Sequence, residues 1–286
     1  MGDETWGNPE NVKDIIHEFN WNHFFEKKSK VTHIIGAPGS GKTHLMEFIA
    51  YASKHIYPVA NIFCGTEDTQ GAFTPIFGGA FVSSKYSAYD HKRIFMRQIL
   101  CKKEKCENNL LLSIIDDMAS DKDAIKSSKA GGEIVKAHKN GSQWFDESLL
   151  MGYQSVRDIS DDIINSPSYV FIFLENEDGN RRKLHRHYFK TCIPEYKDFC
   201  KLMETICGEK FTCLVVDLRK QSAKLSDRIF YFKAPAWKCK STKDSTKKYK
   251  GCPENWRFGC TQFKEWSDKR WDPNQIPDFI KDLSAF

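Results

Sequence analysis

The chain has 286 residues, which suits one large domain or a domain with an appendage. Hydrophobic residues make up 40% and charged residues 28%, a balance that excludes a chain too polar to bury a core. The formal net charge is +5. No apolar run approaches the roughly 18 residues that a membrane helix needs, so no transmembrane segment is predicted.

The positive charge is concentrated in one place. Residues 238–250 hold six lysines and one aspartate, a local charge of +5 that equals that of the whole chain. The rest of the sequence is therefore balanced. A lysine-rich run is usually a solvated loop, and contact with nucleic acid is the sharper alternative; both stay open at this point.

Ten cysteines would allow disulfides, but several lie in strongly apolar runs, where cysteine behaves as a small buried hydrophobe. The first ten residues are acidic and polar, unlike a secretory signal, so we expect a reducing compartment. The pair Cys101 and Cys106 and the set Cys239, Cys252 and Cys260 lack the paired short spacings of a zinc ribbon. We therefore favour free thiols over zinc ligands for these cysteines. The sequence alone does not decide whether any of them binds zinc.

Helical spacing and apolar runs alternate along the chain. Helices are expected at residues 10–28, 42–55, 89–105, 155–166, 193–208 and 277–286, with a loop and a helix over 119–142. Strands are expected at residues 30–36, 57–65, 108–118, 144–154, 167–176, 210–218 and 227–234. These strands are continuously apolar, which is typical of a parallel sheet covered on both faces.

The alternation predicts an α/β fold with a mostly parallel sheet and helices on both faces. It ends near Ala234, where a lysine-rich and then tryptophan-rich tail begins. We therefore expect three regions: a helical lead-in over residues 1–30, a core over 31–233, and a basic, Trp-rich appendage over 234–286.

A phosphate-binding loop follows the first expected strand. The sequence GAPGSGKT matches G-x-x-x-x-G-K-T in full and opens a helix, which is the context that this motif requires. The backbone N–H groups of such a loop surround phosphates, the lysine reaches the β- and γ-phosphates, and the threonine holds Mg²⁺. The predicted nucleotide contacts are Gly36, Ala37, Pro38, Gly39, Ser40, Gly41, Lys42, Thr43 and His44.

Two acids end the apolar strand LLLSIID. A P-loop protein places there the carboxylate that holds Mg²⁺, so Asp116 is predicted as the metal acid beside Thr43. Asp117 follows it and is predicted as the base that activates water. The alternative for Asp117 is a helix cap, because the residues after it are rich in cap formers.

Gln154 ends the next expected strand, where its amide can sense a γ-phosphate by hydrogen bonding. Taken alone, it is an ordinary polar residue at a strand end. A nucleotide kinase needs an arginine-rich lid, whereas an ATP-hydrolysing motor needs a water-activating acid. The Asp116–Asp117 pair favours the motor.

The order of these features resembles a known family. A G-x-x-x-x-G-K-T loop, a strand ending IIDDM, a strand ending in glutamine, then SYVFIFLEN and a late CLVVD followed by DRIFYFKA are similar to the genome-packaging ATPases of the nucleo-cytoplasmic large DNA viruses, poxvirus type, within the FtsK–HerA superfamily of P-loop NTPases. The resemblance covers roughly residues 30–234.

The resemblance implies a RecA-like fold and Mg²⁺-dependent ATP hydrolysis that drives double-stranded DNA into a capsid through a homo-oligomeric ring, a pentamer or hexamer. It assigns catalysis to Lys42, Asp117 and Gln154, and Mg²⁺ to Thr43 and Asp116. Capsid or membrane-associated portal proteins would be partners. The location would be the viral factory in the cytoplasm of an infected cell, the virion, or both.

The chain departs from the family in two places. The run NGSQW stands where NGRH is common, and no arginine directly precedes the strand YVFIF. A motor needs an arginine finger, which is worth 10³–10⁵ in hydrolysis rate. The candidates, none of them favoured, are Arg157, Arg181, Arg182 and Arg186.

Two other functions stay open. One is a nucleotide or small-molecule kinase, against which the weak lid signal argues. The other is a non-catalytic scaffold that binds DNA and nucleotide, which the missing family arginine leaves possible. His185 and His187 suggest a surface or DNA-facing role rather than a metal site, because nothing nearby in the sequence completes a ligand set.

Overall fold

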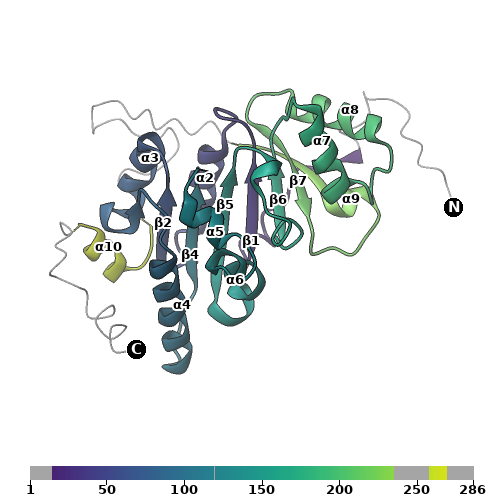
Figure 1. The fold of residues 1–286 in the computed structure, drawn as a ribbon. Coiled ribbons are helices and arrows are strands. Elements are labelled where there is room, and N and C mark those ends of the chain that lie inside the picture. The colour runs from purple at the N-terminus through teal and green to yellow at the C-terminus, as the bar shows by residue number, and fades with distance from the viewer. Residues whose placement is uncertain (1–14, 119, 235–257, 269–286) are drawn as a thin grey trace.

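The computed structural model describes residues 15–118, 120–234 and 258–268 (Figure 1). Eight strands form one sheet in the order β3-β2-β4-β5-β1-β6-β7-β8. The strands are β1 (Val31–Ile35), β2 (Val59–Cys64), β3 (Val82–Ser83), β4 (Leu111–Asp116), β5 (Glu147–Tyr153), β6 (Tyr169–Ile172), β7 (Thr212–Asp217) and β8 (Ile229–Lys233). Neighbours from β3 to β6 are parallel, whereas the β6–β7 and β7–β8 pairs are antiparallel.

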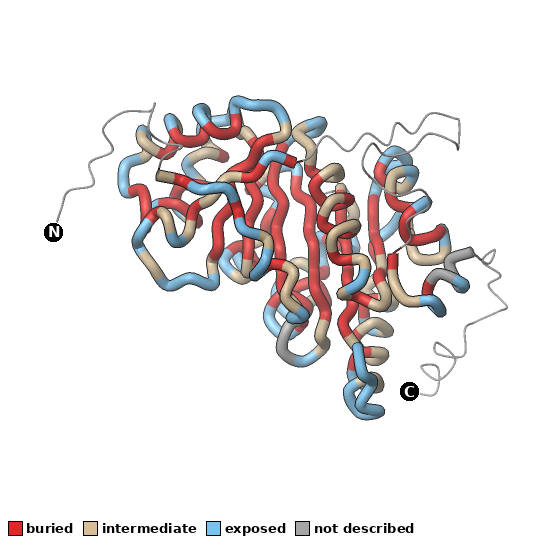
Figure 2. The backbone as a smooth tube through the Cα atoms, turned by 180° about the vertical axis from the view of Figure 1, so that it is seen from behind, coloured by how far each residue is buried: buried red, intermediate tan, exposed pale blue. Residues whose placement is uncertain are grey.

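The predicted α/β class is confirmed. Every residue of β1, β4, β5, β6 and β7 is buried, as the continuous apolar runs require, and Figure 2 shows these strands buried along their length. The sheet separates two hydrophobic clusters, so each face of it has its own covering layer.

Helices cover both faces. One face carries α2 (Lys42–Ser53), α3 (Glu67–Phe77) and α10 (Thr261–Asp268), whose apolar residues belong to one cluster. The other face carries α4 (Ala88–Lys103), α5 (Lys122–Ser127), α6 (Glu133–Asn140), α7 (Asp178–Leu184), α8 (Tyr196–Cys207) and α9 (Leu225–Arg228). Among the described residues, no helix is both long and apolar enough to cross a membrane.

The position of β5 decides where the site residues meet. This strand is inserted between β4 and β1, with Ile115 opposite Met151 and Ile35 opposite Tyr153. The carboxyl ends of β4, β5 and β1 therefore meet at one edge of the sheet. The residues directly after these ends are the predicted acids, the glutamine and the phosphate loop.

The helix expected over residues 10–28 is wrong for residues 16–28, which form turns and bends. This segment lies across the sheet because Phe19, Trp21 and Phe24 pack edge-on, tilted or stacked against aromatic rings of β6 and β8. The backbone N–H of Phe19 also donates to the carbonyl of Tyr231 at 2.8 Å. Packing on the sheet and this strand-like pairing outweigh the helical spacing.

Several other elements differ from expectation. The helix expected over 155–166 is one 3₁₀ turn, Val156–Asp158. Residues 178–189, for which no element was expected, form α7 and the π-helical turn His185–Phe189. Helix α3 was not expected, and it contains Pro75. Strand β3 and helices α9 and α10 were not expected either, and the chain order of the other strands and helices agrees with the sequence pattern.

The described part of the appendage packs on the core. Phe258 is fully buried beside Phe77, and Phe263 stacks on Phe81 with 4.1 Å between ring centroids. The lysine run 238–250, the helix expected over 277–286, Cys239 and Cys252 lie outside the described residues. The three regional boundaries stay predictions.

Candidate nucleotide-binding site

The phosphate loop connects β1 to α2 at the carboxyl edge of the sheet. Gly39 and Gly41 adopt positive φ angles of 75° and 112°, which side chains disfavour, so glycine is needed at both positions. Gly41 directly precedes α2, whose first N–H groups are free of intrahelical partners. This turn can present backbone donors and the positive end of the helix dipole to an anion.

Lys42 lies within the curl of this loop. Its ammonium donates to the carbonyl oxygens of Gly36 at 2.7 Å and Ala37 at 3.3 Å. Burial lowers the pKa of Lys42 below its usual value, while the nearby Asp116 and Asp117 oppose the shift. The ammonium therefore sits where phosphate oxygens can replace the loop carbonyls as acceptors.

Thr43 and Asp116 meet across the edge. The Thr43 hydroxyl donates to Asp116 Oδ2 at 3.1 Å, which brings together the two residues predicted to hold Mg²⁺. Burial raises the pKa of Asp116 to about 6, opposed by Lys42 and by the Thr43 hydrogen bond. The other carboxylate oxygen, Oδ1, is buried and has no hydrogen-bond partner among the described residues.

The unpartnered oxygen of Asp116 faces β5 at Gly152. A Cβ atom at Gly152 would lie 2.0 Å from Asp116 Oδ1, so only glycine leaves room for this carboxylate. A hydroxyl and a carboxylate with a spare oxygen are ligands that Mg²⁺ prefers. The residues present therefore fit the ion that the sequence implied.

Asp117 and Gln154 are also brought together. The Gln154 amide donates to Asp117 Oδ1 from the residue directly after β5, and Gln154 is exposed. Asp117 has a left-handed φ of 57°, which turns the chain sharply after the buried Asp116. The alternative role of Asp117 as a helix cap is wrong: the cap of α5 is Asp121, which accepts from Asp123 and Ala124 N–H groups.

The four candidate arginines are not equivalent. Arg181 is 14% exposed and donates to the Glu175 carbonyl at 2.5 Å and to Glu204 at 2.6 Å. Arg157 is 61% exposed, follows Gln154 by three residues and pairs with Glu177 at 2.9 Å. The remaining two are held locally, Arg182 by Asp178 and the Tyr196 ring, and Arg186 by His187.

His185 and His187 lie on a π-helical turn rather than a strand. His185 is buried and its Nε2 lies 2.7 Å from the Ile193 carbonyl, whereas His187 is paired with Asn165 at 3.2 Å. Within residues 15–118, 120–234 and 258–268, no group of three or more His, Cys, Asp or Glu side chains is placed to hold a metal.

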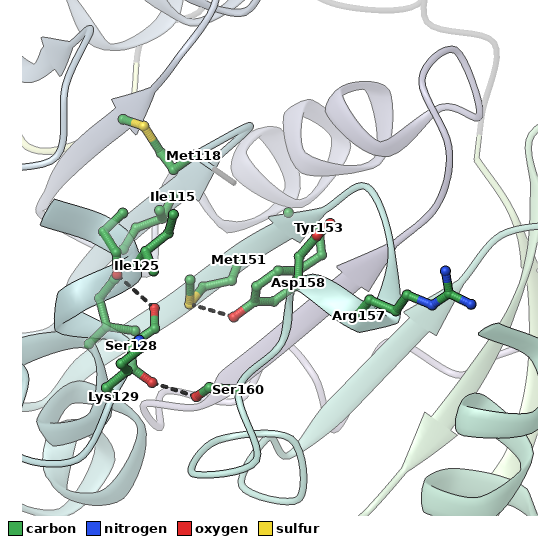
Figure 3. Close-up of a pocket in the computed structure, with 13 residues that line it drawn as sticks. Ile115, Met118, Ile125, Ser128, Lys129, Met151, Tyr153, Arg157, Asp158 and Ser160 are labelled. Atoms are coloured by element: carbon green, nitrogen blue, oxygen red, sulfur yellow. Dashed lines mark hydrogen bonds between the residues drawn. The ribbon is translucent and has the colours of Figure 1, made fainter. Parts of the chain in front are cut away.

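A cavity of about 310 Å³ lies on the α5–α6 face, behind the acids (Figure 3). Its walls are mainly apolar, from Ile115, Met118, Ile134 and Met151, and Figure 3 shows the Arg157 side chain extending away from Ile115 and Met118. The phosphate loop packs on α2, across the sheet. The cavity is therefore separate from the phosphate site.

The same strands carry a buried polar network that was not predicted from the sequence. On the α4–α6 face, Glu147 contacts His91 at 3.1 Å and the Ser113 hydroxyl, and His91 contacts the Tyr86 hydroxyl at 2.7 Å. Next to it, Nε2 of His33 lies 2.8 Å from Nε2 of His138. The signal in the sequence that could have predicted this network was the presence of polar residues inside otherwise apolar strands.

No family model matches the sequence. The chain is 28% identical to the uncharacterised protein 015R of frog virus 3 (isolate Goorha), over 81% of this chain and 68% of that protein. It is 27% identical to the uncharacterised protein 075L of invertebrate iridescent virus 6, over 84% and 85%. It is 26% identical to the uncharacterised protein L437 of Acanthamoeba polyphaga mimivirus, over 94% and 88%.

Among solved structures, the chain is similar to the genome-packaging NTPase B204 of Sulfolobus turreted icosahedral virus 2 in complex with ATP-gammaS. The TM-score is 0.51 at 15% identity, over 72% of this chain and 97% of B204. This likeness confirms at the level of the fold the resemblance to viral packaging ATPases that the motif order indicated. The chain therefore has the same overall fold as B204, an α/β fold with a mostly parallel sheet.

Proposed function

We propose that this protein is an ATPase that drives double-stranded DNA into a viral capsid. The observation that carries the proposal is the joint placement of four residues at one edge: Thr43 on Asp116, and Gln154 on Asp117. A metal acid beside a second, half-exposed carboxylate is the arrangement that hydrolysis by an activated water requires. The fold shared with the packaging NTPase B204 supports the same conclusion.

Each residue has a distinct part in the proposed reaction. The phosphate loop and Lys42 bind the triphosphate and neutralise the β- and γ-phosphates. Mg²⁺, when held by Thr43 and Asp116, would supply charge neutralisation at the phosphates. Asp117 accepts a proton from the water that attacks the γ-phosphorus, so that ADP and phosphate leave. The Gln154 amide can donate one N–H to Asp117 and its other N–H to the γ-phosphate.

A kinase is the second candidate. The same loop and Mg²⁺ residues would serve a kinase, but a kinase excludes water from the γ-phosphate. The carboxylate of Asp117 next to the metal acid favours hydrolysis over transfer to an acceptor. The third candidate, a scaffold without catalysis, gives no role to the Asp117–Gln154 contact.

We infer a homo-oligomeric ring, a pentamer or hexamer, in which an arginine of one subunit reaches the site of the next. The partners would be double-stranded DNA and the capsid or portal proteins. The similarity to viral proteins supports action in the infected cell or the virion. The lysines of 238–250 would add phosphate contacts to DNA.

The test is ATP hydrolysis by the purified protein with and without double-stranded DNA. We expect stimulation by DNA and no phosphate transfer to nucleosides. Asp117→Asn should lower turnover by at least about 100-fold while nucleotide binding is retained. Asp146→Asn is the matched control, because Asp146 also has a left-handed backbone, φ 46°, but precedes β5 at the opposite edge.

Three results would contradict the proposal. An equal rate of ATP hydrolysis with and without DNA in the assembled protein would contradict the proposed DNA motor. Phosphorylated nucleoside as the product would make the protein a kinase. Full activity of Asp117→Asn would move the base elsewhere, with the exposed Glu67 at the start of α3 as the next candidate.

A further inference from the structure

Phe211 has a backbone conformation that is rare for a bulky residue. It lies between α8 and β7 with a left-handed φ of 66° and is only half-buried. Large side chains adopt this region at an energetic cost, and such strained residues gather at ligand sites. The conformation is held in place, since the Phe211 carbonyl accepts from the Ala234 N–H at 2.9 Å.

The order of the strands fixes the direction in which a nucleotide must lie. Asp116, Asp117 and Gln154 follow β4 and β5, on one side of β1. The γ-phosphate must point to that side, where the metal acid and the base are. The nucleoside therefore leaves the phosphate loop on the opposite side of β1, towards β6 and β7. Phe211 directly precedes β7 on that side.

Contacts place the Phe211 ring against the start of α2. A Cβ atom at Gly41 would lie 2.9 Å from Cδ1 of Phe211. The ring centroids of Phe211 and His44 are 6.0 Å apart. His44 directly follows the threonine of the loop, so this is the end of the cradle next to the α-phosphate and its ribose. The ring is thus within reach of the nucleoside.

A flexible side chain lies over the Phe211 ring. The ammonium of Lys210 lies 5.0 Å from the ring centroid, and Lys210 is exposed. A long, exposed lysine can swing away at the cost of one weak cation–π contact. A nucleobase can then take its place on the ring.

We propose that Phe211 is the stacking platform for the base of the bound nucleoside triphosphate, an assignment that rests on the proposed nucleotide-binding function. Stacking uses the π-face that every nucleobase has. The site should therefore bind ATP and GTP with similar affinity. Phe211 would contribute to holding the nucleoside and not to the phosphate chemistry.

The experiment compares two ligands that differ only in the nucleoside. Binding of ATP and of inorganic tripolyphosphate is measured on wild type, Phe211→Asn and Phe211→Tyr. Asparagine suits the left-handed backbone but lacks the ring. We expect Phe211→Asn to lose about 10- to 100-fold in ATP affinity and nothing in tripolyphosphate affinity. Phe211→Tyr should match wild type, and so should Tyr89→Ala, which removes an exposed aromatic ring on α4.

A ring-retaining variant makes the test independent of the folding of Phe211→Asn. In Phe211→Trp, the added indole should be quenched by ATP and GTP, beyond the change in wild type, and not by tripolyphosphate. Equal losses for both ligands in Phe211→Asn, no loss, or no added quenching would each overturn the proposal.

Failure of the underlying function gives a different pattern. Lys42→Ala should weaken both ligands, because the lysine contacts phosphate. If the wild-type protein binds neither ATP nor tripolyphosphate, both the proposed nucleotide site and the proposed stacking role of Phe211 are wrong. If the wild type binds both ligands and Phe211→Asn does not change the ATP affinity, only the stacking role of Phe211 is wrong.

Discussion

Asp116 and Glu147 are buried carboxylates on the neighbouring strands β4 and β5, at 1% and 0% exposure. Asp116 ends its strand beside Thr43 and Lys42, one residue before the half-exposed Asp117. Glu147 begins its strand under α4, where it contacts His91 and Ser113. One cluster borders solvent at the carboxyl edge, and the other is enclosed.

Burial alone therefore does not mark the site. Both clusters contain a carboxylate oxygen without a hydrogen-bond partner among the described residues, Asp116 Oδ1 and Glu147 Oε2. What distinguishes the first is access: it adjoins the phosphate loop and the exposed Gln154. We expect substitutions in the accessible cluster to change mainly the rate of ATP hydrolysis. Substitutions in the enclosed cluster should change mainly the free energy of unfolding.

The largest expected effect comes from removing each carboxylate in turn. Glu147→Ala leaves His91 and Ser113 without their buried partner, so it should lower the free energy of unfolding by about 3–5 kcal/mol. Asp116→Ala should leave that free energy unchanged or raise it, because burial disfavours the charged carboxylate of Asp116 and raises its pKa to about 6.

Urea unfolding and ATP hydrolysis separate the two variants. Asp116→Ala should abolish hydrolysis, whereas the folded fraction of Glu147→Ala should remain active. A strongly destabilised Asp116→Ala with normal hydrolysis would reverse the assignment of the two clusters.

The His33–His138 pair next to the enclosed cluster should make the protein acid-labile. Burial lowers the pKa of His138 to about 4 and that of His33 well below 6.5. Since the folded pKa lies below the unfolded value, stability is fully present above about pH 6.5 and is lost as the pH falls towards 4. His138 alone should account for about 2 kcal/mol at pH 5.

Unfolding measured between pH 8 and pH 5 checks this. His138→Gln should flatten the profile, although it will lower stability at pH 8. His23→Gln, which removes an exposed histidine, should leave the profile as in wild type. A wild-type profile that is flat to pH 5 would contradict the buried, neutral pair.

The sequence was sufficient for the parts that follow local rules. The phosphate loop, the apolar strands and the two acids are short patterns whose context is visible in the chain, and the position of Gln154 after an inserted strand followed from them. Phe211 meets Gly41, and His33 meets His138 on α6, across more than 100 residues, so both contacts depend on how distant elements pack together. The turns at 16–28 arose because aromatic packing on the sheet outweighed helical spacing.

The smallest expected change in the free energy of unfolding comes from the arginines. It again differs between an exposed residue, Arg157, and a largely buried one, Arg181. The Arg157–Glu177 pair is exposed, at 61% and 49%, so Arg157→Ala should change the free energy of unfolding by less than about 1 kcal/mol. Arg181 is largely buried and holds a carbonyl and a carboxylate, so Arg181→Ala should cost about 1–3 kcal/mol.

Measured together, unfolding and turnover then identify the finger. An arginine that reaches a neighbouring subunit's γ-phosphate must be free to leave its own partner, and a surface ion pair is weak enough to allow this. A loss of 10³-fold or more in turnover with unchanged stability would assign the finger to Arg157. A loss of more than 2 kcal/mol in Arg157→Ala would instead make this pair part of the fold, and Arg182 and Arg186 would be the remaining exposed candidates.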